Sequence, residues 1–170
     1  MKKISFRDDV LPLKNKLYRL ALRITLDTAE AEDIVQDTLI KVWNKREDFG
    51  EIESIEAFSL TVCRNLALDR IAKKEAQNIR LDDAQDETLD TASTPYEKLT
   101  HEEGLALVHK LFNALPEKQR TIIQLRDIEG KSYKEIATIL NLTEDQVKVT
   151  LFRTRQRIKQ QYEKIENYGL

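Results

Sequence analysis

Five cationic side chains crowd a short stretch near the end of the chain: Lys148, Arg153, Arg155, Arg157 and Lys159. Such cations can pair with the phosphates of a nucleic acid, and some can also donate to base edges in the major groove. Basic residues late in a helix can instead simply complement the helix dipole and remain solvated. The stretch is denser in cations than that reading requires, so we favour a surface that contacts nucleic acid.

Two short helices separated by a tight break are predicted to position these cations. Ser132 with Glu135, and Thr143 with Gln146, have the spacing of capping boxes, each worth about 1 kcal/mol at a helix start. Asn141 lies at the break between the two helices. The apolar residues that recur at helical spacing are Ile136, Ala137, Leu140, Val147 and Leu151. This pattern predicts a helix-turn-helix, whose second helix can enter a major groove.

The composition predicts an all-α protein. The chain has 170 residues, of which 41% are hydrophobic and 34% charged, with only four glycines and three prolines to interrupt helices. Residues 81–95 carry five acids, no base and no periodicity, which is typical of a flexible linker. We therefore expect two small helical domains, 1–76 and 96–170, joined by an acidic linker at 77–95. The second is expected to be a four-helix domain that contains the helix-turn-helix.

The net charge of −2 constrains how such a protein could act. Phosphate contacts supply most non-specific affinity for DNA, so an acidic chain should bind duplex weakly by itself. We infer that a larger carrier holds it on DNA.

The first half offers two polar helix faces. On a helix that Asp27 is expected to cap, Asp33, Gln36 and Asp37 point away from the apolar side. From the residues alone, a solvated face is the preferred reading of this row. On the next helix, expected over 55–74, Asn65 could offer a donor and an acceptor to an exposed base. Equally, its neighbour Arg64 could form a weak surface ion pair with Asp69.

Catalytic signatures are missing from the sequence. It has no glycine-rich phosphate loop, no nucleophile elbow and no cluster with metal-ligand spacing, so we expect no catalytic residue, no metal and no cofactor. His101 and His109 do not share a helix face, and the single cysteine, Cys63, has a packing context. No apolar run is long enough to span a bilayer, which favours a cytoplasmic protein.

Both halves together resemble the bacterial RNA polymerase sigma factors, specifically the extracytoplasmic-function (ECF) group. The matching motifs in the first half are 31–38, AEDIVQDT, with Trp43 and Phe49, and 64–69, RNLALD. In the second half they are Leu115-Pro116, Gly130, 133–137 (YKEIA), Val147-Lys148 and 153–155 (RTR). The resemblance covers about residues 10–158, leaving only the linker unmatched.

The resemblance implies a set of partners. Asp33, Gln36 and Asp37 would dock on the β′ coiled coil of core RNA polymerase, with the β flap as a further contact of the same enzyme. The linker would thread toward the polymerase active-site channel. A membrane-anchored anti-sigma factor would regulate the protein, which is expected to be a monomer with no small-molecule substrate.

The resemblance also implies the DNA contacts. Phe49, Arg64 and Asn65 would capture an unpaired base of the minus-ten promoter element. The minus-thirty-five element would be read in the major groove by a second set, Lys148, Val149, Phe152 and Arg153. Lys131 and Arg155 would contact phosphates. Val149 and Thr150 depart from the family's common small polar residue followed by arginine, so the promoter sequence cannot be carried over.

Two other classes remain to be weighed. A response-regulator type of DNA-binding protein would share the helix-turn-helix, but it requires a front domain of alternating strands and helices that this sequence lacks. A pure interaction protein that kept the fold and lost promoter reading is disfavoured by Asn65, Lys148 and Arg153. The sequence therefore favours a non-enzymatic sigma subunit that gives core polymerase its promoter specificity.

Overall fold

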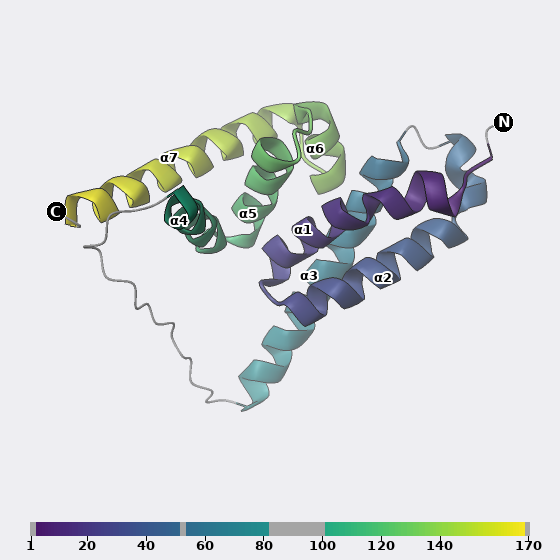
Figure 1. Cartoon of the computed structure of the whole chain (residues 1–170), viewed down its shortest axis with the longest axis horizontal. Helices are drawn as coiled ribbons and strands as arrows, with labels where there is room; N and C mark the ends of the chain where they lie inside the picture. Colours follow the sequence, from purple (N-terminus) through teal and green to yellow (C-terminus); the bar gives the residue numbers. More distant parts are fainter. Residues whose placement is uncertain (1–2, 52–53, 82–100, 169–170) are drawn as a thin grey trace.

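The computed structural model describes residues 3–51, 54–81 and 101–168, and every regular element among them is helical (Figure 1). The expected all-α class is therefore confirmed. No helix in the described ranges is both long and apolar enough to cross a lipid bilayer. Residues 82–95, most of the expected linker, lie outside the described residues.

Three helices form an N-terminal unit, which we define as residues 3–81 without the undescribed 52–53. The α-helices are α1 (Lys14–Thr25), α2 (Thr28–Asn44) and α3 (Ile55–Leu81). Short π- and 3-10 turns accompany them at Phe6–Val10, Leu11–Leu13 and Arg46–Glu51. α1 ends at Leu26, whose φ of 59° is left-handed, and the Asp27 carboxylate then accepts from the Glu30 N–H at 3.1 Å. This sharp reversal lets α2 run back along α1.

The core of this unit follows the predicted periodicity in its first two helices. Along α1, α2 and the segment before α1, residues at three- and four-residue steps are predicted to share an inward face. All of them are buried: Val10, Leu13, Leu17, Leu20, Ala21, Ile24, Ala31, Ile34, Val35, Thr38, Leu39 and Val42. α3 differs, because its fully buried apolar residues are Leu60, Cys63 and Ala67. Helical spacing over 55–74 instead predicts an inward face of Phe58, Val62, Leu66 and Ile71, and these are only half-buried. α3 packs on α1 and α2 and also on α6, so these side chains lie at the edges of its buried face.

Four α-helices form the C-terminal unit, residues 101–168. They are α4 (His101–Asn113), α5 (Glu117–Ile123), α6 (Tyr133–Leu140) and α7 (Glu144–Tyr168), with a π-helical turn, η4, at Gln124–Ile128. α5 starts directly after Pro116, as expected. Gly130 follows η4 with a φ of 71°, a conformation that glycine adopts without strain.

Several boundaries and inward residues differ from expectation. α3 continues past Lys74 to Leu81, and α7 is a long helix rather than a short one. Neither stretch contains a glycine or proline that would stop the helix. On α4, helical spacing predicts that Leu105 and Val108 pack together with Leu111 and Phe112. Leu105 and Val108 are 50% and 37% exposed, however, and only Leu111 and Phe112, in the last turn, are buried.

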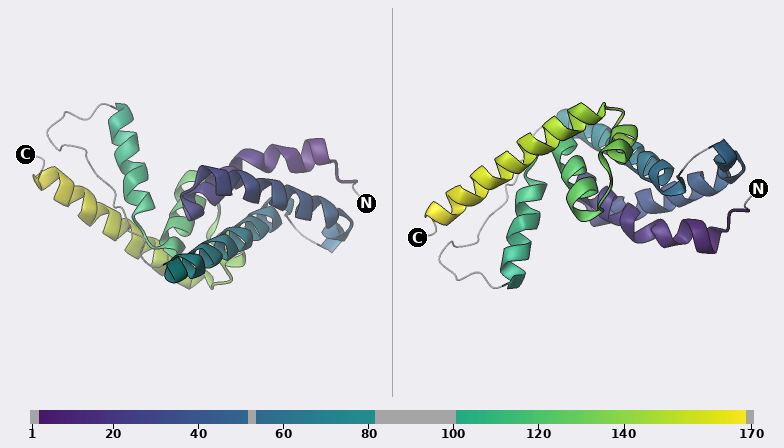
Figure 2. Two further views of the ribbon diagram at one scale, coloured as in Figure 1. Left: turned by 90° about the horizontal axis from the view of Figure 1, so that it is seen from below. Right: turned by 90° about the horizontal axis from the view of Figure 1, so that it is seen from above.

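The two units lie directly against each other. α1 packs against α5, and α3 packs against α6. Figure 2 shows α5 and α6 beside the N-terminal helices, while α7 extends away from them. This placement decides which of the candidate residues are accessible.

Candidate functional site

The predicted helix-turn-helix is present in α6 and α7. Ser132 Oγ accepts from the Glu135 N–H at 3.1 Å, while Glu135 Oε1 accepts from the Ser132 N–H at 3.0 Å. Thr143 and Gln146 make the same reciprocal pair at 3.1 and 2.9 Å. Asn141 turns the chain with a left-handed φ of 57°. Both capping boxes are therefore confirmed, and they fix where α6 and α7 begin.

The outer face of α7 presents the predicted DNA-reading side chains together. Val147 and Leu151 are buried against α6, so the residues between and beside them point outward. All four residues expected to read the minus-thirty-five element are exposed: Lys148, Val149, Phe152 and Arg153. Phe152 is 64% exposed, which makes it an apolar contact within a cationic face. A surface of this kind can both pair with phosphate and pack on the methyl group of thymine.

Tyr133 supports this face, and the sequence analysis did not assign it a role of its own. Lys148 Nζ lies 5.4 Å from the centroid of the Tyr133 ring, and the Arg126 guanidinium carbon lies 4.3 Å from it. Arg126 also donates to the Lys131 carbonyl at 2.8 Å. Cation–π contacts of this kind restrain where the Lys148 ammonium can lie. The sequence signal that could have identified this role is an aromatic residue directly after the Ser132 helix cap.

The two residues expected on phosphates are already paired with carboxylates. Arg155 binds Asp127 within the C-terminal unit, with Nε 3.3 Å from Oδ2. Lys131 binds Glu56, which belongs to α3 in the other unit. Burial is the largest influence on the Lys131 ammonium, and the net effect lowers its pKa. Lys131 is therefore withdrawn from solvent in this arrangement, whereas Arg155 stays exposed in a partly exposed ion pair that a phosphate can replace.

Asp33, Gln36 and Asp37 share the outer face of α2, as predicted. Arg70 of α3 bridges the acids: its Nη2 lies 2.7 Å from Asp33 Oδ2 and 3.2 Å from Asp37 Oδ2. Its Nη1 also donates to Glu30 at 3.2 Å. The hydrogen bond to Asp33 is the largest of the causes that raise the pKa of Arg70. Partly exposed pairs of this type contribute about 1 kcal/mol or less, so an incoming partner can replace Arg70.

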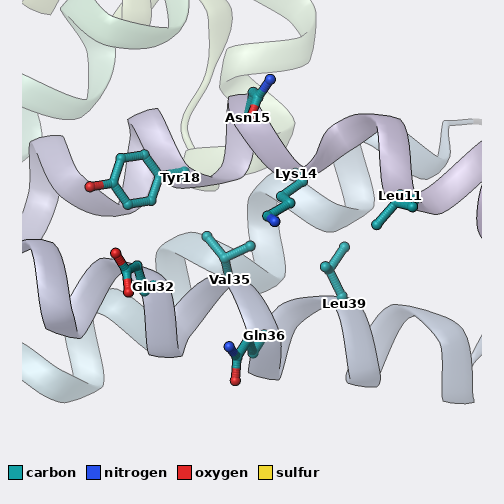
Figure 3. Close-up of a pocket in the computed structure, with 8 residues that line it drawn as sticks. All are labelled: Leu11, Lys14, Asn15, Tyr18, Glu32, Val35, Gln36 and Leu39. Carbon is teal, nitrogen blue, oxygen red and sulfur yellow. The ribbon is translucent and has the colours of Figure 1, made fainter.

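A groove of about 400 Å³ adjoins this acidic face, between α1 and α2 (Figure 3). Gln36 lies at its rim, and Tyr18, Val35 and Leu39 line its apolar wall. Ile40, one turn beyond Gln36 on α2, is 58% exposed. This apolar component was not predicted from the sequence, although an isoleucine one helical turn from Gln36 indicates an apolar patch on the same face.

The candidate minus-ten residues are only partly brought together. Asn65 is exposed on α3, whereas the Arg64 side chain is 15% exposed and its Nη2 lies 3.7 Å from Glu117 of α5. The expected alternative partner of Arg64 was Asp69, so the observed ion pair is a different one. The side chain of Phe49 lies outside the described part, although its backbone belongs to the 3-10 turn Arg46–Glu51.

The described residues contain no group of histidine, cysteine and acidic side chains that could hold a metal ion. Cys63 is fully buried, and burial raises its pKa to about 12, so its thiol is unreactive. These features agree with the packing role expected for Cys63.

Two family models match the chain, in the order of its two units. "Sigma-70 region 2" matches residues 10–77, which cover α1, α2 and most of α3. "Sigma-70, region 4" matches residues 105–158, which include the helix-turn-helix.

Individual relatives agree with both matches. The ECF RNA polymerase sigma factor SigL of Mycobacterium tuberculosis is 36% identical over 141 residues, covering 79% of this chain and 76% of SigL. The sigma factor RpoE of Bartonella quintana, solved in complex with the anti-sigma factor NepR, superposes with a TM-score of 0.75 at 26% identity, covering 93% of this chain and 96% of RpoE. CnrH, solved with the cytosolic domain of CnrY, shares the fold with a TM-score of 0.66 at 21% identity, covering 93% of this chain and 87% of CnrH. The chain therefore belongs to the ECF group of RNA polymerase sigma factors, and its role is promoter-specific initiation of transcription.

Proposed function

We propose that the two units divide the work of a sigma subunit. Residues 1–76 bind core RNA polymerase and capture the minus-ten element, residues 96–170 read the minus-thirty-five element, and residues 77–95 connect them through the polymerase channel. The observation that carries this proposal is the exposed, partly cationic outer face of α7, held by two capping boxes. The protein acts as a non-catalytic, cytoplasmic monomer that depends on the polymerase.

The polymerase contact is the α2 face. Asp33 and Asp37 supply negative charge, Gln36 supplies an amide, and the neighbouring groove offers an apolar surface on which the side chains of a helix can pack. A basic, partly apolar helix of the β′ coiled coil would suit this combination. Docking there provides the carrier that a chain of net charge −2 needs to remain on DNA.

The promoter contacts lie on α3 and α7. Asn65 is exposed and can meet a base edge, with Arg64 and Phe49 as its proposed neighbours at the minus-ten element. On α7, Arg153 and Lys148 donate to bases of the minus-thirty-five element, and Phe152 and Val149 pack on them. Lys131 and Arg155 contact phosphates once their carboxylate partners release them.

An anti-sigma factor regulates the protein under this proposal. RpoE was solved in complex with the anti-sigma factor NepR and CnrH with the cytosolic domain of CnrY, and the similarity to each covers 93% of this chain. We propose an anti-sigma factor with a membrane anchor and a cytosolic inhibitory segment that covers both units.

Transcription by purified core polymerase on a promoter library tests these assignments. Wild type should initiate from a common two-part motif. Asp37→Arg should lose core binding, whereas Glu47→Arg, an exposed acid elsewhere in the same unit, should not.

The two DNA contacts are separated by further variants. Arg153→Ala should lose about 1–3 kcal/mol of discrimination at the upstream element only. Lys164→Ala, exposed further along α7, is its matched control. Asn65→Ala should reduce promoter melting without changing core binding. If wild type fails to engage core polymerase yet binds duplex by itself at moderate salt, the division of roles is wrong.

A further inference from the structure

We propose that Arg23 and Arg120 clasp the two units of the free protein into a closed state that withdraws Arg64 and Lys131 from promoter DNA. The clasp itself is argued from contacts between the units. Its effect on DNA rests on the proposed roles of Arg64 and Lys131.

Arg23 lies in the last turn of α1 and is only 8% exposed, yet its guanidinium pairs with no carboxylate of the described residues. Its three guanidinium nitrogens all meet the C-terminal unit. Nε donates to Gln124 Oε1 at 2.8 Å, Nη1 donates to Asn113 Oδ1 at 2.7 Å, and Nη2 lies 2.8 Å from His109 Nδ1. The Arg23 guanidinium also lies 5.2 Å from the centre of the Phe112 ring. The C-terminal unit thus forms a fitted socket for one cation of α1.

Arg120 makes the reciprocal contact from α5. Its Nε donates to the Arg23 carbonyl at 2.8 Å and its Nη2 to the Ile24 carbonyl at 2.7 Å. These carbonyls end α1, where the helix dipole favours a positive charge. Each unit therefore inserts an arginine into the other, and both bridges lie at the same end of α1.

A third bridge continues the clasp. Arg19 of α1 donates to both carboxylate oxygens of Glu129, from Nε to Oε2 at 2.7 Å and from Nη2 to Oε1 at 2.8 Å. The Gln124 amide also donates to Oε2 of this carboxylate at 3.0 Å. Burial acts to raise the pKa of Glu129, but hydrogen bonds from Arg19 and Gln124 outweigh it and the net pKa is lowered. Glu129 is therefore held as an anion at the junction.

The closed state occupies two proposed DNA contacts. Glu117 of α5 pairs with Arg64 at 3.7 Å, and Glu56 of α3 pairs with both Lys131 and Lys16. In each case a carboxylate of one unit pairs with a cation of the other unit that is proposed to contact a phosphate or a base. DNA and closure therefore compete for the same two cations.

The junction combines polar and apolar contacts. The bridges between the units are polar, whereas the buried apolar side chains of both units belong to one hydrophobic cluster. Polar contacts of this kind are typical of interfaces between domains that move relative to each other. Because only the open state presents both cations, a change that weakens closure should strengthen DNA binding by up to the factor by which it raises the open fraction.

Energy transfer between two dyes measures closure in the full-length chain. Asn44→Cys and Gln160→Cys place labels on exposed positions of the two units, and the buried Cys63 stays unlabelled. Arg23→Gln and, independently, Arg120→Gln should lower the transfer efficiency. Arg7→Gln, an exposed arginine of the N-terminal unit, should leave it unchanged. Circular dichroism confirms that each variant keeps its helix content.

Binding of the free variants to an upstream-element duplex at fixed salt measures masking. We expect Arg23→Gln to bind about tenfold more tightly than wild type. Unchanged energy transfer in both folded variants would overturn the clasp, and opening without tighter DNA binding would overturn the masking. Failure of the proposed function looks different: wild type with core polymerase would then not initiate at all, while the energy-transfer result would stand.

Discussion

Phe152 offers a prediction whose size can be worked from the structure. Its ring is 64% exposed on the outer face of α7, one turn beyond Lys148 and next to Arg153 in the sequence. We expect it to pack on thymine methyl groups of the minus-thirty-five element. The perturbation removes either the ring, by Phe152→Ala, or a single methyl group, by replacing thymine with deoxyuridine.

The two perturbations differ in magnitude. A phenylalanine buries roughly 200 Å², so a ring with 64% exposure has about 130 Å² left to bury. At about 25 cal/mol per Å², complete burial would contribute about 3 kcal/mol, an upper bound for Phe152→Ala. One methyl group contributes about 0.8 kcal/mol, or about fourfold in affinity.

Promoter binding by the assembled polymerase measures both. Thymines of the selected upstream element are replaced one at a time by deoxyuridine, and binding of wild type is compared with that of Phe152→Ala. At the thymine that Phe152 contacts, wild type should lose about fourfold and Phe152→Ala should lose nothing further. Tyr162→Ala, an exposed aromatic later on α7, should keep the wild-type response. The reasoning is refuted if Phe152→Ala is as sensitive to every deoxyuridine as wild type.

Two further predictions concern stability and pH. Ser132→Ala removes the acceptor of the Glu135 N–H, so urea unfolding should show a free energy lower by about 1 kcal/mol, and an equal effect of the exposed Lys134→Ala would contradict the cap. Burial, with the charge of Arg23, lowers the pKa of His109 from its ordinary 6.5. The neutral imidazole therefore contributes fully to closure above pH 6.5, and this contribution is lost as the pH falls through the lowered pKa. The energy transfer described above should therefore decline on acidification, and His109→Gln should flatten that decline if the reasoning holds. The other charged groups around this junction are Arg19, Arg120 and Glu129.

Much of the fold was predictable because its determinants are local. The pairs Ser132 with Glu135 and Thr143 with Gln146 lie three residues apart, so the sequence shows both partners at once. Likewise, the apolar spacing along α1 and α2 identified the buried residues, since each helix packs mainly through one face. The outward position of Asp33, Gln36 and Asp37 followed from the same period. α3 was less predictable because it packs on two sides, so Leu60 and Ala67 are buried where Phe58 and Val62 were expected.

The amino-acid sequence by itself determined where the helices start, which faces are apolar, and that the chain carries the motifs of a sigma factor. Only the tertiary structure decided which partner each charged side chain meets. Arg23 binds Gln124, 101 positions along the chain, and Arg64 pairs with Glu117 rather than with the nearby Asp69. No local period links residues so far apart, because their contact depends on how α1 packs on α5 and α3 on α6. The accessibility of a cation predicted to contact DNA is therefore a property of the closed junction, whereas its presence on a helix is a property of the sequence.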